Sequence, residues 1–384
     1  MIKVLYLSYD GLTDPLGQSQ ILPYLCGLSN EYSITIVSFE KRNRYEVEKE
    51  LIEGICSDNS IQWIPLVYHK NPPVISTLYD LWRLRSVSAM LHRNQDFKIV
   101  HCRSYLTSLV GLWMKNKYHT KFIFDMRGFW ADERVEGGLW NLSNIIYKSI
   151  FNFFKKKERQ FLKNADATIT LTYSAKDQIF DWGFSSHIYV IPCCVDLDHF
   201  NPAKIDPIEK INLKQELGIA QDDFVLLYLG SLGTWYLVDE MKDFFYELRK
   251  TTKTKFLLVT PDEFSSDDAD VIVRKVSRKQ VPLFISIANA SIMLIKNSFS
   301  KKASSATKMA EVMAMNIPVL SNPGWGDVDT ILKEGGGHLI ADAGSTLKSI
   351  EASTCNSREY CLEYFSLEKG IKTYKEVYEE LVKK

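Results

Sequence analysis

The stretch that decides the fold is Ser304-Ser305-Ala306-Thr307-Lys308-Met309-Ala310-Glu311-Val312-Met313-Ala314-Met315-Asn316-Ile317-Pro318-Val319-Leu320-Ser321-Asn322. It begins with small polar residues, continues with a helical pattern that opens at the serine and threonine run, and ends in an apolar strand at 318–320. Serine and threonine favour helix starts because their oxygens accept hydrogen bonds from the free N–H groups of the first turn. The stretch therefore predicts a small-residue loop, a capped helix and a buried strand.

The start of this helix has the chemistry of a nucleotide site. A helix N-terminus favours a bound phosphate, and the loop adds the hydroxyls of Ser304, Ser305 and Thr307. Glu311 lies about one turn inside the helix, where its carboxylate could accept from two neighbouring hydroxyls, such as those of a ribose. A helix packed on a sheet with an exposed glutamate explains the stretch equally well, so both interpretations stay open on these residues alone.

Apolar runs alternate with helical patterns along the rest of the chain, with helical patterns at 18–28 and 78–94, for example. Strand–helix alternation with almost uninterrupted apolar strands predicts parallel sheets covered by helices on both faces. The predicted strands are 4–7, 34–39, 99–102, 122–124, 167–171 and 189–191 in the first half, and 224–229, 256–259, 271–273, 292–295 and 318–320 in the second.

A polar stretch with Asn201-Pro202 and Asp206-Pro207 separates the two halves and predicts a domain boundary. We therefore expect an α/β protein with two doubly wound, Rossmann-like domains, at 1–198 and 199–365, whose parallel sheets face each other across a cleft. Ligands of such sheets bind at the carboxyl ends of the strands. The segment 366–384 predicts a helix that packs back on the first domain, with one apolar face made by Leu367, Ile371, Tyr374, Tyr378 and Leu381.

Composition excludes several classes of protein. The 384 residues carry 47 basic and 47 acidic side chains, so no broad basic field for nucleic acid is expected. The seven cysteines show no zinc-site spacing, which favours free thiols in a reducing compartment. No apolar run reaches the length of a membrane span, and the N-terminal run is too short for a signal peptide. These features predict a cytoplasmic protein.

Four segments, in this order along the chain, resemble motifs of the retaining glycosyltransferases of family 4, which have the two-domain GT-B fold. Residues 158–166 resemble the family's helix that ends in Ala-Asp before a strand. Residues 190–200 resemble its crossover, with Cys193-Cys194 in place of Asn-Gly. Residues 228–232 resemble its glycine-ended strand, and 311–319 its glutamate helix and following strand. The resemblance spans almost the whole chain and implies a nucleotide-sugar donor in the second domain and an acceptor in the first.

The chain departs from the family at positions that normally contact the donor. Ala303 stands where the family usually has a glutamate that holds sugar hydroxyls, and Ser231 stands where it has an arginine that faces the diphosphate. The chain therefore resembles a divergent branch. Lys308, three residues before Glu311 on the same helical face, could restore the lost positive charge, or it could be a solvated surface lysine.

Other candidate site residues follow from the chemistry that the resemblance implies. A departing diphosphate gains charge, so donors and cations should surround it. Gly17 after the first strand, and Gly230 with Ser231 at a strand end in the second half, lie where backbone N–H groups could approach phosphates, although each could equally serve a turn. Arg127 suits an anion and Asp125 a sugar hydroxyl, in a polar cluster that follows the strand at 122–124.

The resemblance thus implies transfer of a sugar from a nucleotide sugar to a cell-envelope glycan or lipid-linked acceptor, with retention of configuration. No metal site is expected, and the fold resembled does not normally use a metal, so neither metal nor other cofactor is predicted. Two alternatives on this fold are a nucleotide-sugar 2-epimerase and a non-catalytic nucleotide-sugar binder. The segment 147–159, with Lys155-Lys156-Lys157 beside phenylalanines, either contacts the inner face of an anionic membrane or is a packed helix with a solvated lysine face.

Overall fold

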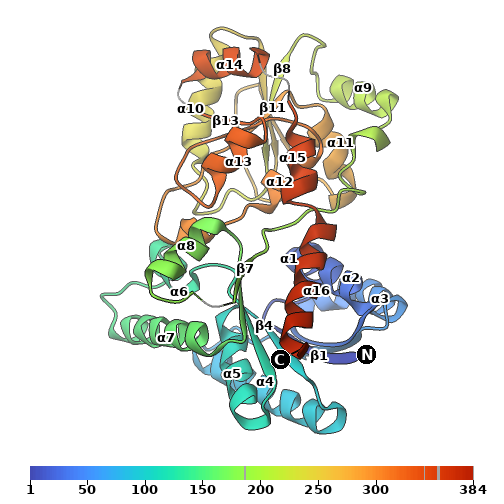
Figure 1. Ribbon diagram of the computed structural model, residues 1–384. Coiled ribbons are helices and arrows are strands. Elements are labelled where there is room, and N and C mark those ends of the chain that lie inside the picture. Colours follow the sequence, from blue (N-terminus) through green and yellow to red (C-terminus); the bar gives the residue numbers. More distant parts are fainter. Residues whose placement is uncertain (186, 341, 353–354, 384) are drawn as a thin grey trace. The chain divides into compact units, whose positions relative to one another are not determined.

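The computed structural model describes residues 1–185, 187–340, 342–352 and 355–383. They form two compact units, of which the first comprises Met1–Pro192 and Leu367–Lys384 and the second Cys193–Ser366 (Figure 1). The chain thus leaves the first unit a few residues before the boundary expected at 198 and returns to it after Ser366.

The first unit is built on a parallel sheet that has seven strands within the described residues, in the order β3-β2-β1-β4-β5-β6-β7. The order reverses between β1 and β4, because β2 and β3 are added on one side of β1 and the strands from β4 onward on the other. The strands are β1 (Ile2–Ser8), β2 (Tyr32–Glu40), β3 (Gln62–Val67), β4 (Ile99–Arg103), β5 (Lys121–Asp125), β6 (Ala167–Thr170) and β7 (Ile188–Val190).

The helices of the first unit connect these strands and include the last helix of the chain. They are α1 (Pro15–Gln20), α2 (Leu22–Ser29), α3 (Arg42–Asp58), α4 (Ile75–Gln95), α5 (Ser104–Tyr118), α6 (Trp130–Glu136), α7 (Ile145–Asn164), α8 (Tyr173–Asp181) and α16 (Leu367–Lys383). Helix α16 lies beside α2, although the two are far apart in sequence (Figure 1). Its buried face includes Tyr374, Tyr378 and Leu381, and Ile371 packs against Gly27 of α2.

The second unit repeats the design with a parallel sheet of six strands in the described residues, ordered β10-β9-β8-β11-β12-β13. The order reverses between β8 and β11. The strands are β8 (Phe224–Leu229), β9 (Thr254–Val259), β10 (Val271–Arg274), β11 (Ala290–Met293), β12 (Val319–Ser321) and β13 (His338–Leu339).

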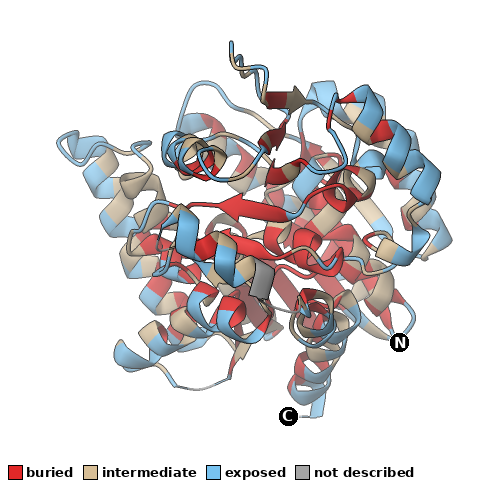
Figure 2. Ribbon diagram, turned by 90° about the horizontal axis from the view of Figure 1, so that it is seen from above, coloured by how far each residue is buried: buried red, intermediate tan, exposed pale blue. Residues whose placement is uncertain are grey.

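The helices of the second unit are η1 (Pro202–Lys204), α9 (Pro207–Glu216), α10 (Val238–Arg249), η2 (Arg278–Gln280), α11 (Val281–Ser286), η3 (Ser300–Ala303), α12 (Thr307–Ala314), α13 (Val328–Glu334), α14 (Ala343–Ala352) and α15 (Ser357–Tyr364). They form a core on each face of the sheet. Successive strand residues point to opposite faces, so Val225 and Leu227 of β8 pack in the core that includes α12, and Leu226 and Tyr228 pack in the core that includes α10. In Figure 2 the strands are accordingly coloured as buried, and buried and exposed residues alternate along the helices.

The predicted doubly wound α/β fold is confirmed, and each predicted strand overlaps an observed one. Two details differ. The predicted helix at 18–28 is two helices, because the backbone breaks at Ile21 and Pro23 in the first turn of α2 has no N–H to continue α1. The sequence analysis also missed β3, an edge strand that contains Pro65, and the two-residue β13.

Candidate functional site

The candidate site lies in the second unit at the point where its strand order reverses. Loops that follow β8 and β11 meet there, at the carboxyl ends of their strands, and this is the place where open parallel sheets bind ligands. The loop after β8 begins at Gly230, and the chain after β11 leads through η3 into α12. The sequence singled out residues in both segments.

Helix α12 begins at Thr307, and its N-cap is Ala306, which has no side-chain oxygen to offer. The predicted serine or threonine cap is therefore wrong. The Ser305 hydroxyl instead accepts a hydrogen bond from the Cys193 N–H at 3.0 Å. Ser304 is the residue that directly follows η3. Within the described residues, the N–H groups of Thr307 and Lys308 have no protein acceptor, as is usual in a first turn without a capping side chain.

Lys308 is a half-buried cation rather than a solvated surface lysine. Its Nζ lies 3.6 Å from the centre of the Tyr236 ring and 5.0 Å from that of Tyr228, whose hydroxyl it approaches at 3.4 Å. It forms no ion pair with a described carboxylate. Burial lowers the pKa of Lys308 to about 7, against the opposing pull of Glu311 and Asp262.

Gly230 makes room for this lysine. Its φ of +118° is in a region that only glycine adopts readily, and a Cβ added there would lie 2.3 Å from the Lys308 Nζ. The glycine therefore serves the approach of a cation, whereas the sequence predicted an approach of its backbone to a phosphate.

The rest of the loop after β8 is held by neighbouring strand ends. The Tyr228 hydroxyl donates to the carbonyl of Ser231, and the Leu232 N–H donates to Asp262 at 2.6 Å. Asp262 follows β9, the neighbouring strand. These bonds shape the Ser231 turn without using the Ser231 side chain.

Glu311 is buried, with 8% of its surface exposed, so the alternative of an exposed glutamate is wrong. Its Oε1 accepts from Arg278 at 3.0 Å, and the Arg278 guanidinium also lies 5.4 Å from the Phe200 ring. Burial raises the pKa of Glu311, and Arg278, Lys308 and His199 oppose the shift. The carboxylate is thus paired with the partly exposed Arg278, and the charge of Lys308 also favours its ionised form.

The sequence analysis missed Arg278. It lies in η2 directly after β10, at the same edge of the sheet as the other residues. The sequence feature that could have pointed to Arg278 is the pair Ser277 and Gln280, which forms a capping box. A capping box marks the start of a helix, here directly after a strand at the edge of the sheet where ligands bind.

The sugar-binding role expected for Asp125 is not supported by its position. The residue ends β5 in the first unit and is fully buried, so it is not available to a sugar as the sequence suggested. Its Oδ2 accepts from Tyr374 of α16 at 3.3 Å and lies 3.4 Å from the His101 ring. Burial alone would raise the pKa of Asp125, yet Arg127, His101 and Arg103 hold it below its usual value. Asp125 is the centre of an internal polar network.

Arg127 belongs to the same network, since one of its guanidinium nitrogens lies 3.8 Å from Asp125. Its φ of +56° is uncommon for a residue with a side chain. The side chain is almost fully buried, and the anion that Arg127 approaches is the Asp125 carboxylate of the same unit.

Gly17 lies inside α1 and is buried, not in a loop that could receive a phosphate. A Cβ added to Gly17 would lie 2.0 Å from the Gly11 carbonyl oxygen and 2.7 Å from the Leu12 Cα. The small residue is therefore required for packing of α1 on the preceding loop.

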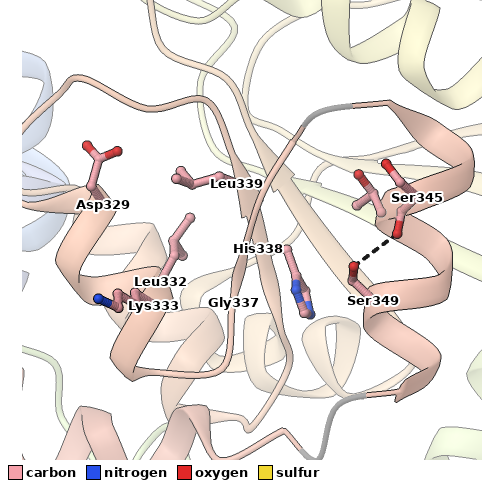
Figure 3. A pocket seen from close by; sticks show the side chains of 9 residues that line it. Asp329, Leu332, Lys333, Gly337, His338, Leu339, Ser345 and Ser349 are labelled. Atoms are coloured by element: carbon pink, nitrogen blue, oxygen red, sulfur yellow. Dashed lines mark hydrogen bonds between the residues drawn. The ribbon is translucent and has the colours of Figure 1, made fainter.

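A hollow of about 260 Å³ lies elsewhere in the second unit, between α13, β13 and α14 (Figure 3). Asp329, Lys333 and Leu332 line it from α13, and Ser345 and Ser349 from α14. It is smaller than the usual range for small-molecule sites, and it contains none of the residues that the sequence singled out.

Residues 27–199 match the model of Glycosyltransferase Family 4. The match covers most of the first unit and just under half of the chain. No curated protein matches the sequence.

Solved structures of the whole chain's length are similar in fold. Sucrose-phosphate synthase (tll1590) from Thermosynechococcus elongatus is 14% identical, with a TM-score of 0.74 over 100% of this chain and 99% of that one. Anabaena Alr3699/HepE in complex with UDP and glucose is 12% identical, with a TM-score of 0.68 over 99% and 100%. UDP-GlcNAc 2-epimerase from Neisseria meningitidis bound to UDP-GlcNAc is 12% identical, with a TM-score of 0.58 over 99% and 100%. The chain has the GT-B fold.

Proposed function

We propose that the protein is a glycosyltransferase that transfers a sugar from a nucleotide-sugar donor. The family match and the nucleotide-bound structures of similar fold support this class. The observation that carries the proposal is the half-buried Lys308 beside Glu311 on α12, at the point of the second sheet where ligands bind. Even a half-buried cation without a carboxylate partner loses part of its hydration, and an anionic ligand would offset that loss.

In this proposal the second unit holds the nucleotide. Glu311 accepts hydrogen bonds from the ribose hydroxyls, with Arg278 holding its carboxylate at 3.0 Å. The diphosphate lies at the start of α12, where the N–H groups of Thr307 and Lys308 and the Thr307 hydroxyl are available to it. Ser304, Ser305, Gly230 and Ser231 shape the surrounding loops.

Lys308 has the central chemical role. As the bond between sugar and diphosphate breaks, negative charge grows on the leaving oxygen, and a cation fixed nearby stabilises that charge. Lys308 is fixed by Tyr228 and Tyr236 before any ligand arrives, so little reorganisation is needed when the charge develops. A bound diphosphate also raises the pKa of Lys308, which keeps the lysine charged at neutral pH.

We further propose that the transfer retains anomeric configuration, needs no metal, and uses a cell-envelope glycan or a lipid-linked acceptor bound by the first unit. These finer assignments are supported by the sequence resemblance to family 4. Within the described residues, no group of three or more histidine, cysteine or acidic side chains has the arrangement of a metal site. We expect Lys308 and the helix start to neutralise the diphosphate.

The function is tested by incubating the purified protein with UDP, GDP, CDP and ADP sugars, with and without an extract of envelope lipids and glycans. A glycosyltransferase forms a new glycoside only when donor and acceptor are both present, and the anomeric proton signals of donor and product report retention. Release of nucleotide without any new glycoside, with every donor and extract, would contradict the proposal.

A 2-epimerase is the second candidate, because the Neisseria epimerase shares the fold and Ala303 removes a side chain that family 4 uses on the donor sugar. An epimerase converts the donor alone and needs no acceptor. A non-catalytic binder, the third candidate, would bind a nucleotide sugar and convert nothing. The same incubation separates the three.

A further inference from the structure

Helix α4 of the first unit turns apolar side chains outward. Ile75 is 65% exposed, Leu78 61%, Tyr79 47% and Trp82 64%. Residues three, four and seven positions apart lie on the same face of a helix, so these four side chains form one surface. We call this surface the α4 face.

The α4 face lies opposite the side with which α4 packs into the first unit, where α5 is its neighbouring helix. That side buries Ser76, Asp80, Leu84 and Ser88. A surface helix ordinarily buries its apolar stripe and exposes its polar one, and the first half of α4 does the reverse. An apolar surface that the fold leaves exposed marks an interaction site.

A buried carboxylate fixes the position of the α4 face. Asp80 is fully buried and accepts from the Tyr9 hydroxyl at 3.0 Å, from the His69 N–H at 3.1 Å and from the His69 ring at 2.6 Å. Tyr9 directly follows β1 and His69 follows β3 by two residues. The start of α4 is thus tied to the edge of the sheet where ligands bind.

The loop and helix that carry the α4 face are rich in basic residues. Lys70, Arg83, Arg85 and Arg93 lie between residues 68 and 95, and Asp80 is the one carboxylate in that segment. Because Asp80 is buried and hydrogen-bonded, the charges that the segment exposes are positive: Lys70 and Arg93 are exposed, Arg83 is half-buried, and Arg85 stacks on the Trp113 ring at 4.3 Å. Clustered lysine and arginine beside an apolar face are attracted to anionic lipids, and tryptophan and tyrosine favour the membrane–water interface.

Helix α7, which contains the segment 147–159, is the alternative site for such a contact. Lys155 pairs with Asp132 at 2.7 Å and also with Glu158, and Phe154 is buried. Lys148, Lys156 and Arg159 of α7 are exposed, whereas Lys155 and Lys157 are half-buried. Helix α7 does expose Ile145, Ile146 and Phe153, which makes it a matched comparison site.

We propose that the α4 face inserts its apolar side chains into the surface of an anionic membrane while the neighbouring basic residues contact lipid headgroups. This contact is peripheral, since no described helix has the length and apolar character of a membrane span. It goes beyond the proposed function and does not depend on it. It would bring the sheet edge beside Tyr9 close to a lipid surface.

The test is flotation of the purified full chain with vesicles of phosphatidylcholine and phosphatidylglycerol, compared with vesicles of phosphatidylcholine alone. The parent should float with the anionic vesicles at low salt and not with the neutral ones. The triple variant Ile75→Ser, Leu78→Ser, Trp82→Ser should lose about tenfold or more in partitioning, because binding scales with buried apolar area. A second variant, Arg83→Gln with Lys70→Gln, should weaken binding to anionic vesicles and reduce its salt dependence.

The matched control is Ile145→Ser, Ile146→Ser, Phe153→Ser on α7, which should float like the parent. All replaced apolar side chains are exposed, and thermal unfolding should confirm that each variant is folded. The proposal would be overturned if the parent did not float, or if the parent and the α4 variant floated equally. It would also be overturned if only the α7 variant lost flotation. A parent that is dimeric in light scattering and becomes monomeric in the α4 variant would instead assign the face to self-association. Nucleotide binding by the α4 variant should match the parent, so this test and that of the proposed function can fail separately.

Discussion

At the scale of single residues, Lys308 is the most informative side chain. It lies 3.6 Å from the Tyr236 ring, and its burial would be costly in a protein that bound no anion. Lys308→Met should lower kcat by a larger factor than it raises KM, because the charge on the leaving group is greatest in the transition state. Loss of one such cation typically costs about 3 kcal/mol, or roughly a hundredfold in rate. Lys308→Arg should retain part of the activity, and steady-state kinetics with saturating donor measures both.

A Lys308→Met enzyme that turns over at the parent rate would remove Lys308 from the reaction. The two variants separate the charge of Lys308 from its shape. Lys308→Met keeps an unbranched chain without the charge, and Lys308→Arg keeps the charge in a larger group. Because Gly230 leaves little space beside Nζ, the larger guanidinium should fit less well.

The lowered pKa of Lys308 predicts how donor binding depends on pH. Below about pH 7 the lysine is already charged in the free protein, and binding takes up no proton there. Above that pH the lysine is neutral until the donor binds, so binding must take up a proton and affinity should fall by up to about tenfold per pH unit. Calorimetry in two buffers of different ionisation enthalpy measures the proton uptake. An intact nucleotide sugar is the ligand of choice, since its diphosphate does not titrate in this range.

The control for this pH dependence is Lys308→Met, whose donor affinity should be lower and nearly flat between pH 6 and pH 9, roughly the window in which the lysine titrates. Equal proton uptake by the parent and this variant would mean that another group titrates on binding.

At the scale of elements, α1 carries the clearest prediction. Gly17→Ala should destabilise the protein by about 1–3 kcal/mol, because the new Cβ would meet the Gly11 carbonyl and the Leu12 backbone, neither of which can move freely. Its affinity for nucleotide sugars should stay at the parent value. Urea unfolding measures the first and calorimetry the second. A variant of parent stability that loses nucleotide affinity would restore the phosphate role first expected for Gly17.

The elements also show what the sequence could and could not predict. Strands with continuous apolar runs were predicted correctly, because burial on both faces leaves a strong signal. Edge strand β3 was missed because Pro65 and its half-exposed residues weaken that signal. The cap of α12 was predicted wrongly because the Ser305 hydroxyl bonds to the distant Cys193 N–H, which no local pattern reveals.

The same limit applies to the site. Lys308 and Glu311 could be proposed from the sequence because they share one helix face, and their spacing is local information. Arg278 comes from a different element and reaches Glu311 only through the fold of the sheet. Asp125 was placed correctly at a strand end, but the sequence could not show that Tyr374 of α16, far along the chain, would cover it. Long-range contacts of this kind follow from topology and not from local patterns.

At the scale of the whole molecule, the account predicts a metal-independent enzyme. If Lys308 and the start of α12 neutralise the diphosphate as proposed, excess EDTA should leave the rate of sugar transfer unchanged. Added Mg²⁺ or Mn²⁺ should not raise it. Loss of activity in EDTA that is restored by either ion would show that a metal takes the role assigned here to Lys308.

The most direct test of the central claim is the equilibrium binding of nucleotide sugars to the parent protein and to Glu311→Ala. The claim is that the start of α12 in the second unit binds the donor, with Glu311 on the ribose. The account predicts saturable binding of at least one UDP, GDP, CDP or ADP sugar to the parent, and affinity weaker by about tenfold or more in the variant, since a lost charged hydrogen bond costs roughly 1.5–3 kcal/mol. The variant should remain folded, because Arg278 is partly exposed and can be hydrated once its partner is gone. Absence of binding by every nucleotide sugar, or equal affinity in parent and variant, would contradict it.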